Sequence, residues 1–226
     1  MKNNIMSKSW MTVLVLLGFS LHHACAQNLQ LHYNTGKDRG YLNHTLEMFK
    51  PDTFGSTFLF VDLDYNMAGN KTMSLGYFEI ARYITLPIGN RKLDVTVQFN
   101  DGVDYFIGAL GQAWLAGLSY PLRIGNFEIK ADVLYRAAQG SDGPDAQLTM
   151  AWYHAWMNDR LVFTGYLDAW TQGPSGDKKG AVMAEPQLWY RFWNALSAGS
   201  ELKTHYHFMP DDKLHAYPSL ALKWDF

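Results

Sequence analysis

The sequence has one cysteine, Cys25, among 226 residues, and that cysteine lies close to the N-terminus. Beyond the N-terminal segment there is no apolar run near the roughly 20 residues that a membrane-spanning helix needs. No charge of one sign dominates, since 19 Lys and Arg stand against 21 Asp and Glu. These absences exclude a disulfide scaffold and a helical membrane bundle, and they argue against nucleic acid as a partner.

Residues 1–26 have the three parts of a secretory signal peptide. Two lysines precede an apolar run at residues 10–21, and Ala24-Cys25-Ala26 is an A-x-A-like cleavage site. The run is too short for a spanning helix. Lipidation of Cys25 is an alternative, although the residues before it do not fit a lipobox. We expect cleavage before Gln27, which leaves one cysteine-free domain at residues 27–226.

What the sequence does have is alternation, most clearly at its C-terminus. A side chain in a strand points to the opposite face from its neighbours, so a period of two indicates a strand with one apolar face. A terminal aromatic residue is the usual assembly signal of outer-membrane β-barrels, so we expect Phe226 to engage the barrel-assembly machinery. The apolar set is Leu220, Leu222, Trp224 and Phe226, and the other set is Ala221, Lys223 and Asp225.

Short and long breaks alternate along residues 27–226 and separate twelve segments of strand length. Short turns that alternate with longer loops are typical of the periplasmic and extracellular ends of an outer-membrane barrel. We therefore expect an all-β, antiparallel transmembrane barrel of about 12 strands, in contact with outer-membrane lipid and monomeric. The short breaks are residues 50–55, 87–91, 121–126, 158–160 and 194–195, and the long ones are 34–40, 66–71, 100–108, 137–145, 172–180 and 208–213.

Aromatic residues occur close to the ends of these segments, as the interfacial girdles of such barrels require. A soluble β-sandwich or lipocalin-like barrel is the alternative. The predicted girdle at the long loops consists of Tyr33, Tyr65, Phe99, Tyr135, Trp170 and Tyr206, and the girdle at the short turns of Phe49, Tyr83, Tyr120, Trp156, Trp193 and Trp224.

A period of two fixes which side chains face the lumen once the apolar face is assigned to lipid. Residues 93–99 and 127–133 show the alternation most clearly, with polar residues such as Asp94, Gln98, Lys130 and Asp132 between the apolar ones. For a single charged residue, a lumenal salt bridge is the simplest interpretation. By the same rule, the further charged residues that we expect to face inward are Glu47, Asp62, Asp64, Glu79, Asp168, Glu185, Arg191, Glu201, Lys203 and Lys223.

Several aromatic residues fall on the polar face, where lipid contact does not explain them. They can fill a narrow barrel, or they can stack a planar solute whose polar edge binds the carboxylates and amides. Those on the polar face are Phe58, Phe60, Tyr77, Tyr153, Tyr166, Trp170, Trp189 and Tyr217. As lumenal substrate-binding candidates we take Phe58, Phe60, Asp62, Asp64, Tyr77, Glu79, Tyr153, Tyr166, Asp168, Trp189 and Arg191.

The order of several short motifs resembles the nucleoside-specific channel Tsx and its OmpK relatives. The motifs are Thr45-Leu46-Glu47 with Phe49, Phe60-Val61-Asp62, Phe78-Glu79-Ile80 with Arg82-Tyr83, and Trp224-Asp225-Phe226. The chain also looks like Bacteroidetes outer-membrane proteins of about this length that resemble shortened Tsx barrels. The resemblance implies a twelve-stranded monomeric barrel for facilitated diffusion of nucleosides. The connections are shorter here, so a constriction built from loops and individual substrate contacts do not carry over.

We therefore expect a passive channel for nucleosides or similar small polar solutes. A closed structural or surface-binding barrel is the alternative, which salt bridges among lumenal charges would favour. An outer-membrane lipid hydrolase needs a serine beside a histidine, and His154, Ser197 and Ser200 lie on segments that do not favour such a pair. We expect no enzyme and, without a phosphate-binding glycine loop, no cofactor.

Histidines near one long break could bind a divalent metal. His205 and His207 have the spacing of two residues on one strand face, and His215 follows across a break that contains Asp211 and Asp212. This spacing is permissive and not specific, because strand-end histidines beside an acidic loop are usually solvated. No metal site is predicted.

Overall fold

A computed structural model describes residues 26–36, 39–65, 69, 72–88, 91–208 and 213–226, and nearly all of them are strand. The predicted signal peptide lies almost entirely outside these residues and stays a prediction. No helix in the described part of the chain is long and apolar enough to cross a membrane. The strands are β1 (Ala26–Asn34), β2 (Leu42–Asp52), β3 (Gly55–Tyr65), β4 (Met73–Ile88), β5 (Arg91–Asp104), β6 (Gly108–Ala109), β7 (Ala113–Ile124), β8 (Phe127–Ala138), β9 (Asp145–Trp156), β10 (Leu161–Gln172), β11 (Lys179–Ala184), β12 (Gln187–Trp193), β13 (Leu196–Tyr206) and β14 (Leu214–Asp225).

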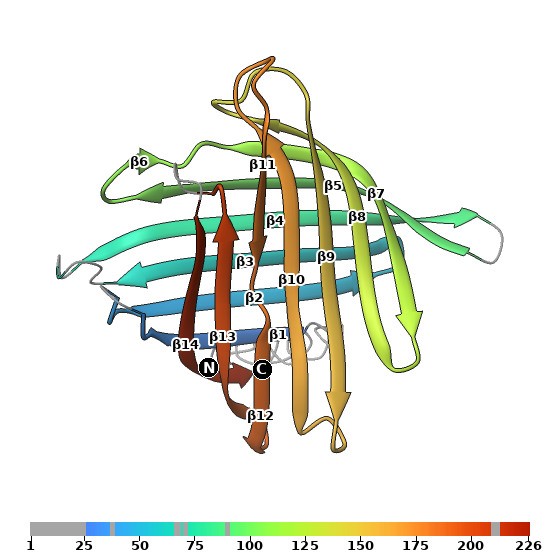
Figure 1. Cartoon of the computed structure of the whole chain (residues 1–226). Helices are drawn as coiled ribbons and strands as arrows, with labels where there is room; N and C mark the ends of the chain where they lie inside the picture. The colour runs from blue at the N-terminus through green and yellow to red at the C-terminus, as the bar shows by residue number, and fades with distance from the viewer. Residues whose placement is uncertain (1–25, 37–38, 66–68, 70–71, 89–90, 209–212) are drawn as a thin grey trace, which may run out of the picture.

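The strands form one closed antiparallel barrel. Successive strands pair along the chain, except that β6 pairs only with β5 and that β11 and β12 both lie between β10 and β13. β1 pairs with β14, so the barrel wall is closed. In Figure 1 the front wall, from β9 to β14, crosses the back wall, from β1 to β5, at a steep angle. The Phe226 amide donates to the Gln27 carbonyl, which joins the two ends of the barrel wall. The twelve expected strands are confirmed, with β11 and β12 as two parts of one strand and the two-residue β6 outside the barrel wall.

The interruption between β11 and β12 lies at Glu185 and Pro186. Proline has no amide proton, so it cannot donate to the sheet. The ladder is kept on both sides, because the Glu185 amide donates to the Tyr166 carbonyl and the Leu202 amide donates to the Pro186 carbonyl. β10 comes very close here, since a Cβ on Gly165 would lie 2.4 Å from the Glu185 carbonyl oxygen. A glycine is therefore required opposite this break.

One long break begins later than the sequence predicted. β5 continues to Asp104, so Asn100 is paired in the sheet with Glu79 and Ala113. The connection to β7 contains the two-residue strand β6, which pairs back onto β5 and projects from the barrel wall in Figure 1. The glycine and aspartates of residues 100–104 suggested a loop, but the partner strand is long enough to hold them in the ladder.

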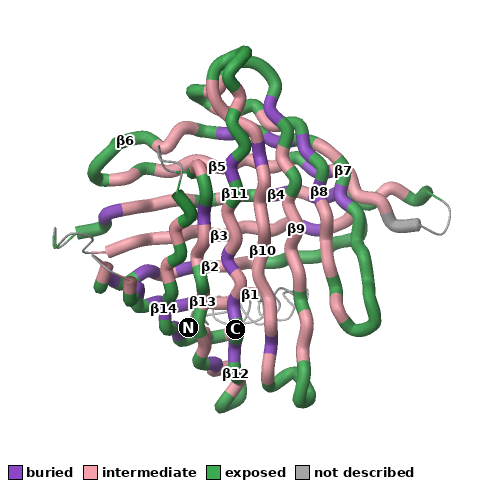
Figure 2. Tube along the Cα trace, in the orientation of Figure 1, coloured by how far each residue is buried: buried purple, intermediate pink, exposed green. Residues whose placement is uncertain are grey.

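The predicted phase of inward and outward side chains agrees with the pairing. On β1 and β2 the polar pairs Asn28–Glu47 and Gln30–Thr45 face the lumen, and Leu29 with Leu46 lies outside. Large apolar residues are exposed around the outer wall, as in a barrel surrounded by lipid. Figure 2 shows that buried residues are spread along many strands and do not form one central core.

Nine of the twelve predicted girdle aromatics lie on the outer face, and three do not. Tyr83 is buried and its hydroxyl donates to Asp132, while Trp170 is buried and donates to Gln172. Phe49 lines the lumenal cavity at its short-turn mouth. Each stands an even number of residues from an inward carboxylate on its own strand, namely Glu47, Glu79 or Asp168, and that phase overrides its position near a strand end.

Candidate functional site in the barrel lumen

A cavity of about 890 Å³ occupies the lumen. It reaches the barrel mouth at the short turns, where Gln27, Asn194 and Asp225 line it, and that end faces the periplasm in outer-membrane barrels. Deeper in, it extends to Asp62 and Glu185. Of the described residues in the long loops, none lines it. The structure thus has a pocket that is accessible from the short-turn end.

Two corners of the lumen are filled by side chains from strands that are not paired. At one corner His32 meets the Trp189 ring at 5.9 Å, and Gln30 lies within hydrogen-bond reach of Gln187. At the opposite corner Asp132 accepts from Tyr83 and from Gln98, both at 2.9 Å. The cavity is the space that these two corners leave between them.

Carboxylates of the cavity are held by neutral donors on the neighbouring strand or on the same strand. The Tyr77 hydroxyl donates to Glu79 at 2.5 Å, Thr45 donates to Asp62, and Thr149 donates to Asp168. Hydroxyl donors orient a carboxylate without neutralising it. Amide donors do the same for two more, since Asn28 donates to Glu47 at 2.8 Å and Gln187 to Glu201 at 2.7 Å.

Aromatic rings form a continuous strip on one wall. Phe58, Phe60 and Tyr77 follow one another across β3 and β4, with ring centroids 6.0 Å and 5.8 Å apart. Tyr166 of β10 and Tyr153 of β9 line the opposite wall. Rings and carboxylates therefore alternate around the cavity, which suits a solute with an apolar face and a polar edge.

A charged bridge stands on the long-loop side of the cavity. Lys203 of β13 lies 2.9 Å from Glu185 and 4.0 Å from Asp62, so it connects β13 with β3 across the lumen. Tyr217 is its partner on β14, and the Arg39 guanidinium lies over the Tyr217 ring at 4.1 Å. We call Lys203 with its two carboxylates the crossbar.

The structure brings most of the predicted substrate-binding candidates together. Eight of the eleven line the cavity, and the other three lie behind it: Asp64 accepts from Asn43, Tyr77 supports Glu79, and Trp189 fills a corner. Their role in binding a substrate stays a prediction. The eight are Phe58, Phe60, Asp62, Glu79, Tyr153, Tyr166, Asp168 and Arg191.

Sequence reasoning placed some amides of the cavity on the lumenal face but did not include any amide or hydroxyl residue outside the tyrosines among the substrate-binding candidates. Gln98, Asn100, Gln147 and Thr164 line it beside the charged residues. Their alternation with apolar neighbours indicates an inward face but does not distinguish a solute contact from a structural hydrogen bond. The cross-lumen corners carried no signal in the sequence, because they depend on which unpaired strands approach each other.

The histidines do not share one face as their spacing suggested. His205 faces inward and stacks on His215 with centroids 4.8 Å apart, but His207 lies beyond β13 with a φ of 55°. The His207 Nδ1 lies 2.9 Å from the Gly180 carbonyl oxygen. Among the described residues no group of three His, Cys, Asp or Glu is arranged to hold a metal, and Asp211 and Asp212 lie outside those residues.

His154 and Ser197 are on opposite sides of the barrel wall. The His154 ring stacks on Phe127 on the outer face, and its Nδ1 lies 3.0 Å from the Asn126 carbonyl oxygen. Ser197 is buried on the lumenal face of β13. This geometry does not assemble the serine and histidine pair of a lipid hydrolase.

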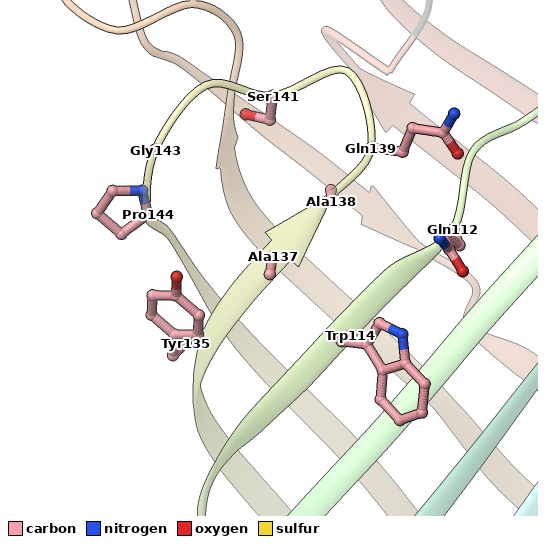
Figure 3. Close-up of a pocket in the computed structure, with 9 residues that line it drawn as sticks. All are labelled: Gln112, Trp114, Tyr135, Ala137, Ala138, Gln139, Ser141, Gly143 and Pro144. Carbon is pink, nitrogen blue, oxygen red and sulfur yellow. The ribbon is translucent and has the colours of Figure 1, made fainter.

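A second hollow, of about 540 Å³, lies on the outer wall at the long-loop end of β7 and β8. Figure 3 shows its lining, with Trp114 and Tyr135 below the loop that carries Ser141 and Pro144. Both rings are more than half exposed and belong to the outer girdle region. This hollow faces the surroundings of the barrel and does not connect with the residues of the lumenal cavity.

The fold is a closed barrel of twelve antiparallel strands with an apolar outer wall and a polar lumen, as in outer-membrane porin structures. The chain belongs to the family described as domain of unknown function (DUF5020), which matches residues 26–226. No curated protein matches the sequence. It is similar in structure to the KdgM porin in complex with disordered oligogalacturonate, with a TM-score of 0.55, 8% identity, and coverage of 89% of this chain and 99% of that one. The NanC porin structure gives a TM-score of 0.58, 9% identity, and coverage of 88% and 100%.

Proposed function

We propose that this protein is a passive outer-membrane channel for small polar solutes. One observation carries the proposal: the lumen contains a cavity of about 890 Å³ that is lined by polar side chains and reaches the short-turn mouth. That volume lies within the roughly 300–1,000 Å³ of small-molecule pockets. Carboxylates and amides that bind a solute weakly allow it to enter and to leave, which is what conduction requires.

Nucleosides are the solutes that we propose first. The rings of Phe58 and Phe60 can stack a planar base, and the neighbouring Asp62 and Glu79 can accept hydrogen bonds from its amino group or from the sugar hydroxyls. The order of motifs that resembles Tsx supports the same solute class. The KdgM porin binds oligogalacturonate. The fold that this chain shares with that porin supports solute passage here but not the choice of solute.

A closed structural barrel is the second candidate, and the crossbar favours it. Lys203 joins β13 to β3 between the cavity and the long loops, and two corners of the lumen are filled. In that case the cavity is a blind pocket. The two candidates differ in whether a solute can pass the crossbar.

Liposome swelling separates them. Liposomes that carry the folded protein should swell faster in adenosine or thymidine than in sugars or amino acids of similar size. Phe58→Ala and Asp62→Asn should reduce the nucleoside rate, and Asp177→Asn, in an exposed loop, should leave it unchanged. If protein with the heat-modifiable migration of a folded barrel gives no swelling with any solute, the channel proposal is wrong and the closed barrel stands.

A further inference from the structure

The charges that line the cavity are strongly unequal. Of the described residues around it, seven carry carboxylates and three are basic. Over the whole sequence the two signs nearly balance, with 19 basic and 21 acidic residues, so the excess of acid is a property of the cavity. The carboxylates are Glu47, Asp62, Glu79, Asp168, Glu185, Glu201 and Asp225, and the basic residues are Lys130, Arg191 and Lys223.

The basic residues do not neutralise this excess. The Lys130 ammonium lies over the Tyr83 ring at 2.9 Å from its centroid, and the Lys223 ammonium lies over the Trp189 ring at 4.7 Å. Both rings belong to the filled corners. Within the described chain, neither lysine nor Arg191 forms an ion pair with a cavity carboxylate. Lys203 pairs with Glu185 and Asp62 but lies outside the cavity lining.

Four of the other five carboxylates, those of Glu47, Glu79, Asp168 and Glu201, accept hydrogen bonds from neutral donors. Glu79 is bound by a tyrosine hydroxyl, Asp168 by a threonine hydroxyl and Glu47 by an asparagine amide. These donors come from the wall and fix one oxygen of each carboxylate. A walled cavity with one sign of charge raises the local concentration of the opposite sign, because low-dielectric walls focus the field.

The aromatic strip points to the same kind of solute. Phe58 and Phe60 line the cavity beside Asp62 and Glu79. Ring faces attract cations, most strongly where water is displaced, and the oxygens of the neighbouring carboxylates attract them as well. An anion meets repulsion from both groups.

We propose that the lumen selects solutes by charge, accepting small organic cations and amine-bearing planar solutes and rejecting anions. This inference rests on the proposed channel function, because it names the solute class of the same cavity. It predicts that protonated amines enter more readily than neutral nucleosides of equal size, and that nucleotides, with their phosphates, are excluded.

Thiol labelling tests the charge of the cavity without requiring conduction. Residues 27–226 contain no cysteine, so Thr164→Cys places one thiol in the cavity and Thr53→Cys places one in an exposed short turn on the same side. We expect a trimethylammonium methanethiosulfonate to react with Cys at position 164 faster than the sulfonate reagent does, relative to position 53. An equal or inverted ratio overturns the inference.

Reversal potentials in planar bilayers with a KCl gradient then test the charge selectivity separately from the channel function. We expect K⁺ to be favoured over Cl⁻, and Glu79→Gln or Asp168→Asn to lower the permeability ratio by about tenfold, because one unit charge at roughly 6 Å in water acts on the two ions in opposite directions. Arg191→Gln should raise it, Glu79→Asp should retain it, and Asp177→Asn should not change it. Current without cation preference overturns the charge inference alone, and no current from folded, inserted protein overturns the channel function as well.

Discussion

At the scale of single residues, Trp189 is the side chain on which the interior depends most. It is 1% exposed, its indole donates to Gln187 at 2.9 Å, and its ring lies against Gly199 on β13 and His32 on β1. A Cβ on Gly199 would lie 2.5 Å from the ring. The Trp189 ring thus fills the space beside Gly199, which has no side chain of its own.

Trp189→Ala should therefore destabilise the barrel by about 3–5 kcal/mol, the usual range for removing a buried tryptophan. Trp193→Ala, on the same strand but 65% exposed on the outer wall, should cost much less. Urea unfolding of the refolded protein in detergent micelles, followed by far-UV circular dichroism, measures both. Equal losses for the two variants would show that the corner around Trp189 does not hold the barrel together.

The inward or outward direction of a side chain was predicted correctly from the period-two alternation of its strand. It was predicted wrongly where closeness to a strand end was used instead. The ten charged residues from Glu47 to Lys223 that the period of two assigned inward do face the lumen, because one face of every strand must meet lipid. Phe49, Tyr83 and Trp170 were assigned to girdles from their position near strand ends, although the phase of its strand had also placed Trp170 on the polar face. The inward carboxylates on the same strands, Glu47, Glu79 and Asp168, already contradicted that assignment.

At the scale of elements, the strand formed by β11 and β12 depends on glycine in its neighbour. Gly165 has a φ of 147° and lies opposite Glu185 and Pro186, with no space for a Cβ. An alanine there is strained in its backbone and collides with the Glu185 carbonyl. The local approach of β10 to the interrupted strand is therefore possible only with glycine.

Gly165→Ala should reduce the yield of folded barrel and lower its unfolding temperature. Gly180→Ala is the matched control, since it lies on β11 with no atom within 4 Å of its built Cβ. The fraction that keeps the fast-migrating folded form on cold gel electrophoresis, followed over a temperature series, reports the difference. A Gly165→Ala barrel as heat-stable as the control would contradict this account of the interruption.

The ends of strands were predicted correctly where turn-forming residues coincide with the end of pairing in the sheet. The turns at residues 158–160 and 194–195 agree, and Asn158 and Asn194 adopt the positive φ that asparagine tolerates. The break at 100–108 was placed too early, because Gly102 and Asp101 remain paired with β4. Pairing to a long partner strand outweighs local turn composition, and the sequence of one strand does not reveal its partner's length.

For the whole molecule, the crossbar is the feature that decides between a passage and a pocket. Lys203→Gln removes the ion pairs with Glu185 and Asp62 and shortens the side chain that spans the lumen. We expect a larger single-channel conductance in planar bilayers, with Lys50→Gln, at an exposed position near the short-turn end of β2, as the control. Conductance that is unchanged in Lys203→Gln would show that the crossbar does not restrict the pathway.

The cavity as a whole was only partly predictable. Alternation gives the set of inward side chains, and from it the acidic and aromatic character of the lumen follows. Which of them leave open space does not follow, because that depends on contacts such as Lys203 with Asp62 or Tyr83 with Asp132 between strands that never pair. Strand tilt and shear set those contacts, and neither is encoded in a pattern of period two.

The most direct test of the central claim is single-channel conductance after the cavity is filled. Ala151 lines the cavity on β9, and Ala146 on the same strand faces outward. We predict that the wild type and Ala146→Trp conduct alike and that Ala151→Trp loses most of the current, because the indole occupies the lumen. A conductance that Ala151→Trp leaves unchanged would contradict passage through this cavity.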